Sequence, residues 1–175
     1  MRRAAVWVGL TAFALAAASS ASAGFSLTSS ASPSFSVTLN GSDQTGAYTV
    51  PMTVDNSTTV LPPFVAMTGG WNLTVTSTTF TTGGGKTLAT NASTMTGVAS
   101  ACAGVCTSNP SNSVTYPLGV PAGSSPPAAV KFFNAAANTG IGTFTITPTV
   151  SVAVAASAYA GSYTSTLTLT LAAGP

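Results

Sequence analysis

The side chains that could carry out acid, base or metal chemistry are few in this chain. Beyond residue 3 the charged groups are two carboxylates and two amines, and the chain has no histidine: Asp43, Asp55, Lys86 and Lys131. A Ser-His-Asp or Cys-His arrangement therefore cannot be built. The only possible carboxylate pair, Asp43 and Asp55, flanks a strand-like segment whose extended length separates its ends. We expect turn and loop roles for both aspartates, and we expect the protein not to be an enzyme.

The two cysteines, Cys102 and Cys106, are separated by three residues that include Gly104. In an exported protein this spacing favours a local disulfide. A metal site would need more ligands than a chain without histidine or further cysteine supplies, and a redox motif would have the Cys-x-x-Cys spacing. We therefore predict a disulfide between Cys102 and Cys106, with no metal site and no cofactor.

The N-terminus has the pattern of a secretory signal peptide. Arg2 and Arg3 precede an apolar run over residues 4–18, and small residues follow up to Ala23. This pattern predicts cleavage after Ala23. A membrane anchor is the alternative, but the apolar run is shorter than the ~20 residues that a helix needs to span a bilayer. We expect export without a transmembrane anchor.

Residues 24–175 are numerous enough for one domain with a full core. Their two aspartates and two lysines give a formal net charge of zero. Nucleic acid is not an expected partner, because phosphate binding needs clustered lysine and arginine. Solubility must come from threonine, serine, asparagine and glycine. Such a neutral surface gives little charge repulsion against self-association.

Apolar residues alternate with threonine, serine or asparagine throughout the chain, and Gly-rich or Pro-rich turn sequences separate the alternating runs. The pattern predicts an all-β domain, an antiparallel β-sandwich or a barrel-like fold with long Gly/Thr/Ser/Pro-rich loops. Residues 78–101 and 119–129 are expected to be surface loops. Pro51 and Pro148 lie inside strand-like runs, which places them at sheet edges or bulges. The expected strands contain Phe35-Val37-Leu39, Tyr48-Val50-Met52-Val54, Trp71-Leu73-Val75, Val114-Tyr116-Leu118, Phe144-Ile146 and Val150-Val152-Val154.

The last residues read as one half-buried strand, because Tyr163, Leu167, Leu169 and Leu171 alternate with threonines. Trp71 could offer a surface on which a sugar ring stacks, but its spacing with Leu73 and Val75 favours burial. Tyr163 presents the same alternatives: a core position with its hydroxyl reaching a loop, or a ligand contact. Tyr116 and Tyr159 are further candidates for an exposed aromatic platform.

Two of these segments resemble the motifs of the WxL family of cell-wall-binding surface proteins. Gly70-Trp71-Asn72-Leu73 is similar to the Trp-any-Leu motif, and Tyr163, Leu167, Thr168, Leu171 and Pro175 match the distal motif that closes such domains. The family's distal Trp is Leu169 here. The resemblance implies a single WxL-like β domain over residues 24–175 that binds peptidoglycan. The wall contacts that it implies are Trp71, Leu73, Tyr163, Leu167 and Thr168.

These observations predict a secreted surface protein that binds non-covalently to the peptidoglycan, or another wall polymer, of a Gram-positive bacterium. The alternative is a self-assembling subunit of a surface filament or layer, favoured by the zero net charge and by a terminal strand that could add to a neighbour's sheet edge. Other surface proteins could also be partners. A glycan hydrolase is a third hypothesis, and it would require turnover that depends on Asp43 or Asp55.

Overall fold

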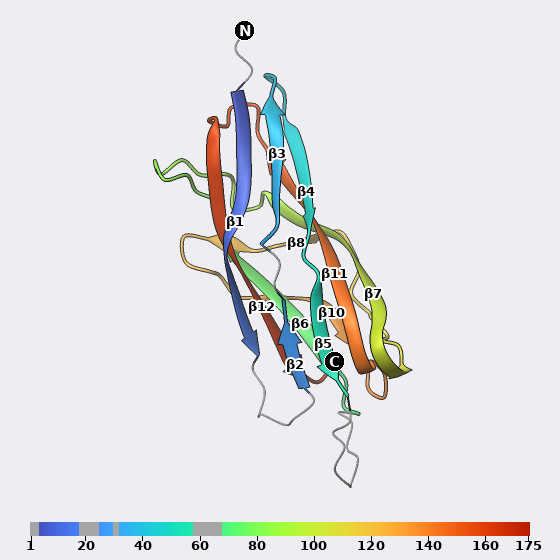
Figure 1. Ribbon diagram of the computed structural model, residues 1–175. Coiled ribbons are helices and arrows are strands. Elements are labelled where there is room, and N and C mark those ends of the chain that lie inside the picture. Colours follow the sequence, from blue (N-terminus) through green and yellow to red (C-terminus); the bar gives the residue numbers. More distant parts are fainter. Residues whose placement is uncertain (1–3, 18–24, 30–31, 58–67) are drawn as a thin grey trace.

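Two β-sheets face one another in the computed structural model, which describes residues 4–17, 25–29, 32–57 and 68–175 (Figure 1). The predicted all-β, sandwich-like fold is confirmed, and the described residues contain no helix. The strands are β1 (Ala4–Ala17), β2 (Phe25–Thr28), β3 (Ser34–Leu39), β4 (Gln44–Thr49), β5 (Met52–Asn56), β6 (Trp71–Thr78), β7 (Ser93–Ser108), β8 (Leu118–Gly119), β9 (Ala122–Gly123), β10 (Val130–Ala135), β11 (Ile141–Val154) and β12 (Gly161–Ala173).

Each sheet has six strands arranged around one long strand. The first sheet has the order β10-β6-β12-β1-β3, with β9 also paired to β6. The second has the order β2-β5-β11-β7-β8, with β4 also paired to β11. All pairings are antiparallel except β1 with β12 and β6 with β9. The predicted cleavage site after Ala23 lies outside the described residues.

The core lies between the two sheets and follows the period of two in the sequence. In β12 the odd-numbered residues from Tyr163 to Leu171 are buried, and the threonines between them are partly exposed. Strand β11 has the same alternation, with Phe144, Ile146 and Val150 facing inward. Burial of each of these apolar side chains stabilises the fold by about 1.5–3 kcal/mol. The two strands form the centre of the sandwich.

The predicted run from Tyr48 to Val54 forms two strands instead of one. Strands β4 and β5 pair in succession along the same side of β11, and Val50 and Pro51 separate them. Proline has no backbone N–H, which explains the interruption at Pro51. Pro148 lies within the central strand β11, paired on both sides, and the ladder to β7 shifts register immediately after it, between Thr149 and Val150.

Two further expectations about chain segments were wrong, and one strand was not expected. The predicted loop over residues 78–101 ends early, because β7 begins at Ser93. The expected strand around Tyr116 is reduced to β8, since Asn112 instead accepts backbone hydrogen bonds from Val114 and Asn134. Strand β10 was missed because consecutive buried residues, Phe132 to Ala135, and a register shift hide the alternation.

An aromatic contact joins the two layers between the start of β3 and the end of β4, away from the turn that connects these strands. The rings of Phe35 and Tyr48 stack with centroids 6.0 Å apart, and the Phe35 ring covers Gly46 so closely that a Cβ there would overlap it. Strand β3 belongs to the first sheet and β4 to the second. The stack therefore packs the edge of one sheet against the other, and it buries the phenol of Tyr48.

Burial raises the pKa of Tyr48 above the usual tyrosine value of about 10. Because the folded state favours the neutral phenol, its stabilisation is fully present below about pH 10 and is lost as the pH rises further. We expect the free energy of unfolding to fall above about pH 10 by up to ~1.4 kcal/mol per pH unit for this group. Urea denaturation over this range should show a shallower fall for Tyr48→Phe. Burial also raises the pKa of Tyr116, so some slope remains; equal slopes for the two proteins would contradict the assignment.

Candidate functional site

The residues of the two sequence motifs lie mainly in the core. Trp71, Leu73, Tyr163 and Leu167 are all buried, with at most 2% of any side chain exposed. Thr168 is partly exposed on the outer face of β12. The alternatives for Trp71 and Tyr163 are thus decided in favour of burial, and the four buried side chains present no surface on which a ligand could lie.

Trp71 forms a hydrogen bond that fixes the connection before β11. Its indole N–H donates to the carbonyl oxygen of Gly140 at 2.9 Å, and the side-chain amide of Asn56 donates to the same oxygen at 2.9 Å. Gly140 has a φ of 63°, and a Cβ there would approach Trp71 Nε1 to 2.7 Å and the Ala135 methyl to 2.6 Å. Only glycine fits this position without displacing the tryptophan.

The two motifs are neighbours in the fold although about ninety residues separate them in the sequence. Strands β6 and β12 pair so that Leu171 lies opposite Leu73 and Ala173 opposite Trp71. Gly174 N–H donates to Gly70 O at 2.9 Å, and the amide of Asn72 donates to Gly174 O at 2.7 Å. Together the two motifs fasten the end of β12 to the start of β6.

The distal motif also positions an exposed aromatic residue. The Tyr163 hydroxyl donates to the backbone carbonyl of Tyr159 at 3.0 Å, so a buried motif residue holds the β11–β12 loop. Tyr159 itself is 61% exposed. The ammonium group of Lys86 lies 4.2 Å from the centroid of the Tyr159 ring, within range of a cation–π interaction.

Tyr159 borders an open cleft of about 660 Å³. Three segments line the cleft: the end of the β3–β4 turn and the start of β4, with Asp43 and Gln44, the β6–β7 loop with Thr87 and Asn91, and the β11–β12 loop that carries Tyr159. The β3–β4 and β11–β12 connections lie at the same end of the sandwich in Figure 1. The size is within the range of small-ligand sites, and the lining combines one aromatic ring with amide, hydroxyl and carboxylate groups.

Hydrogen bonds fix two walls of this cleft. Asp43 Oδ1 accepts from the backbone N–H of Ala156 at 2.8 Å, which joins the β3–β4 turn to the β11–β12 loop. The Gln44 amide donates to Asn40 Oδ1 at 2.8 Å within the turn. In the β6–β7 loop, the Lys86 backbone N–H donates to Thr82 Oγ1 at 3.0 Å. The polar groups of the cleft are therefore held on ordered loops.

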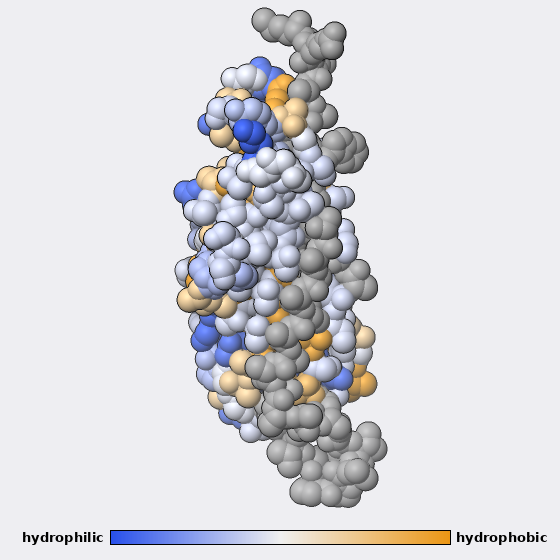
Figure 2. Space-filling view, turned by 90° about the vertical axis from the view of Figure 1, so that its left-hand side faces the viewer, coloured by the Kyte–Doolittle hydropathy of each residue, from blue (hydrophilic) through white to orange (hydrophobic). Residues whose placement is uncertain are grey.

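A threonine-lined groove of about 610 Å³ continues from the cleft on the other side of Thr87 and Leu88, which line both. Its remaining lining includes Thr78, Thr81 and Thr90. Threonine hydroxyls both donate and accept hydrogen bonds, as sugar hydroxyls do. Figure 2 shows the side of the molecule that lies on the left in Figure 1, and pale surface of intermediate hydropathy dominates its coloured residues.

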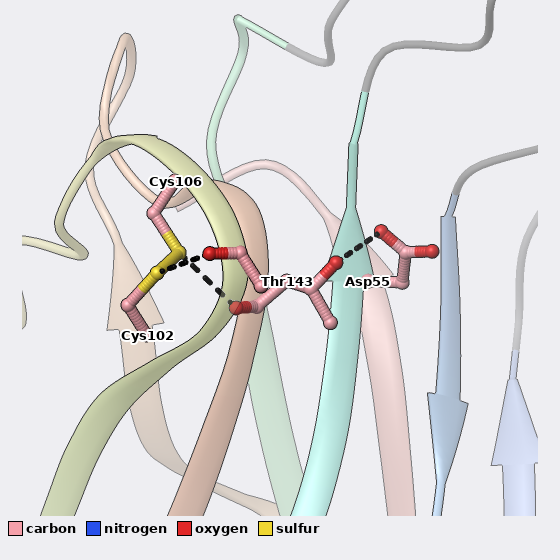
Figure 3. The surroundings of a disulfide bond; sticks show 5 residues. Asp55, Cys102, Cys106 and Thr143 are labelled. Carbon is pink, nitrogen blue, oxygen red and sulfur yellow. Dashed lines mark hydrogen bonds between the residues drawn. A yellow bond between two sulfur atoms is a disulfide. The ribbon is translucent and has the colours of Figure 1, made fainter.

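The other end of the sandwich holds the disulfide (Figure 3). Cys102 and Cys106 are bonded, as predicted, with their Cα atoms 6.1 Å apart. They close a bulge of β7 opposite Gly142 and Phe144 of β11, and Val105 within the bulge is 87% exposed. Nearby, Asp55 Oδ1 accepts from Thr143 Oγ1 at 3.2 Å. The disulfide thus constrains a bulge within a strand.

The chemistry-bearing residues are distributed between the two ends. Asp43 lies in the turn that borders the cleft, and Asp55 lies beside the disulfide, where it also accepts from the Ser57 N–H at 2.9 Å. The two carboxylates therefore do not form a pair. Within the described residues, no group of three or more metal-binding side chains is assembled, and no helix is long and apolar enough to cross a membrane.

No protein-family model and no curated protein sequence matches this chain. Its own geometry therefore supplies the candidate site. Of the aromatic candidates, Tyr159 is exposed, whereas the Tyr116 hydroxyl donates to the backbone of Phe132 and its ring is partly buried. Sequence reasoning missed the contributions of Asp43 and Asn91 to the cleft and of Lys86 to the Tyr159 ring, because only the folded loops bring these residues together.

The contact between Gly140 and Trp71 makes a stability prediction. Gly140→Ala should lower the free energy of unfolding by about 2–4 kcal/mol, because the new methyl meets the indole and the backbone must keep a positive φ. Gly97→Ala is the matched control, since a Cβ at Gly97 meets no atom within 4 Å. Urea denaturation measures the free energy of unfolding of both variants. Equal stabilities would contradict the role of the contact between Gly140 and Trp71.

Proposed function

We propose that this chain is an exported surface protein that binds peptidoglycan non-covalently and that the Tyr159 cleft is its binding site. The observation that carries the site is an exposed tyrosine, held from the core by Tyr163, at the mouth of a cleft with polar walls. The WxL-like motifs at Trp71 and Tyr163 support the choice of a wall polymer as the ligand. In this proposal the motif residues act through the fold and do not touch the ligand.

The chemistry of the cleft suits a neutral, hydroxylated polymer. The exposed part of the Tyr159 ring offers an apolar platform for the C–H face of a sugar ring. Thr87, Asn91 and Gln44 offer hydroxyl and amide groups to glycan hydroxyls and acetamido groups, or to the amides of the peptide stem. The adjoining threonine-lined groove extends the contact along a polymer.

Among the described residues, Lys86 places a positive charge against this platform. Its ammonium group already contacts the Tyr159 ring and carries no salt bridge to either aspartate, so it is available to a carboxylate of the peptide stem. Such a contact would distinguish a peptide-bearing wall polymer from an uncharged polysaccharide. Each of these interactions contributes only about 0.5–3 kcal/mol. Useful retention on the wall would therefore require several contacts or several molecules acting together.

Tyr159→Ala should abolish or strongly weaken binding to isolated peptidoglycan sacculi, with at least a roughly tenfold rise in the dissociation constant, because the stacking platform is lost. Co-sedimentation across a range of sacculus concentrations measures this, with circular dichroism to verify folding. Val105→Ala is the matched control, since it removes an exposed apolar side chain at the opposite end. Unchanged binding by folded Tyr159→Ala would exclude the cleft, and no binding by the folded wild type would exclude peptidoglycan.

The two lysines permit a second, charge-specific test. Lys86→Gln should weaken binding to sacculi and reduce its dependence on salt, because screening acts on the contact between the ammonium group and a stem carboxylate. Lys131→Gln removes the same charge from an exposed position on β10, away from the cleft, and should leave binding unchanged. The same salt titration applies to both variants. Equal binding and equal salt dependence of the two variants would show that Lys86 makes no contact with a stem carboxylate.

A further inference from the structure

The strand β12 has a hydrogen-bonded neighbour on each side, and one of the two is the predicted signal segment. Strand β1 (Ala4–Ala17) runs parallel to β12 from Val6 opposite Gly161 to Ala17 opposite Leu171. Strand β3 joins this sheet only through β1. The inner position in the first sheet is thus filled by a segment that export would remove.

The backbone groups of β12 that face β1 can be assigned from the other side of the strand. Thr164 N–H donates to Thr81 O and Thr81 N–H to Thr164 O, each at 2.9 Å, so the peptide groups of Thr164 point away from β1. Gly174 N–H likewise points to Gly70. Because these directions alternate along a strand, Leu167, Leu169 and Leu171 direct their N–H and C=O groups toward β1.

Loss of β1 would leave these groups without a strand partner. Strand β3 cannot cover them, because its pairing with β1 ends at Ser34 opposite Gly9, which is itself opposite Thr164. The stretch from Ser165 to Leu171 therefore lies beyond the end of β3. It has alternating leucine and threonine, with no charged residue and no proline. Edge strands usually carry a charged residue or a proline that prevents pairing with another chain, and this stretch has neither.

We propose that the exported chain, once cleaved after Ala23, forms a two-fold symmetric dimer in which β12 of one copy pairs antiparallel with β12 of a second copy about Thr168. This inference rests on the proposed export. The pairing would place Leu167 opposite Leu169 of the second copy on the inner face, and Thr166 opposite Thr170 on the outer face. The two first sheets would then become one continuous sheet.

A second copy is the partner that we infer because the stretch is symmetric about Thr168 and because the cleaved chain has no net charge. A strand centred on Thr168 meets its own sequence with leucine against leucine and threonine against threonine, which keeps both sandwich cores closed. Residues 24–175 have zero formal net charge, so two copies approach without repulsion. At the centre, the two Thr168 residues would form a non-hydrogen-bonded pair, in which the side chains are closest.

Analytical ultracentrifugation of residues 24–175 and of the full chain tests the proposal. The cleaved chain should sediment as a dimer at micromolar concentration, and the full chain, with β1 in place, as a monomer. A peptide with the sequence of residues 4–17 should dissociate the dimer, because it occupies the same edge. A monomeric cleaved chain, whether folded or unfolded by circular dichroism, would overturn the proposal, as would an exported chain whose N-terminal sequence still includes residues 4–17.

A matched pair of variants separates edge pairing from other association. In the cleaved chain, Thr168→Lys should raise the dimer dissociation constant by roughly tenfold or more, because two like charges meet at the centre of the interface. Ser151→Lys places the same charge on β11, which is paired on both sides, and should leave the dimer intact. A dimer that persists equally in both variants would overturn the proposal.

Binding to sacculi distinguishes this inference from the proposed function. The Tyr159 cleft does not include Thr168, so a monomeric Thr168→Lys protein should still bind sacculi, with weaker retention because it has one site in place of two. If the cleaved wild-type chain is monomeric but binds sacculi, only the proposed dimer is overturned. A dimer that does not bind sacculi would overturn only the proposed function.

Discussion

The pairing of β6 with β12 is the interaction on which most of this structure depends. Trp71 at the start of β6 lies opposite Ala173 near the end of β12, and its indole holds the Gly140 carbonyl before β11. The pair therefore connects the centre of the first sheet to the entry of the central strand of the second. Asn72 and Gly70 fasten the last residues to the same place through Gly174. These bonds hold the end of β12 against the start of β6.

The same strand connects the core to the surface. Its inward leucines supply core surface, while Tyr163 near its beginning extends a hydroxyl to the backbone of Tyr159. A change in the core at Tyr163 would therefore move the exposed ring without any direct contact to a ligand. Under the proposed function, residues of the motif would therefore affect binding while they remain buried. It separates the residues that build the site from those that would touch a ligand.

The small number of charged residues determines the chemistry of both the Tyr159 cleft and the strand β12. Four charged side chains beyond residue 3 leave hydroxyls, amides and one aromatic ring to form the contacts of the cleft. Such contacts are short-ranged and individually weak, so they suit an abundant polymer better than a rare soluble ligand. Low charge also leaves β12 without the lysines that usually prevent an edge strand from pairing with another sheet. The proposed wall binding and the proposed self-association are therefore compatible with one neutral surface.

The sequence by itself determined the fold class, the disulfide and most of the central strands, because alternation with a period of two is a local property that any half-buried strand must show. It also favoured burial of Trp71 on the same ground. It missed β10, where consecutive phenylalanines face a bulge, and it extended one strand through Pro51. The tertiary structure alone decided that Trp71 meets Gly140 and that Tyr159 is the exposed ring. It also decided that Asp43 and Asn91 line one cleft and that Lys86 lies over the Tyr159 ring. Those relations join loops far apart in the chain, and no local pattern of residue types encodes which loops will meet.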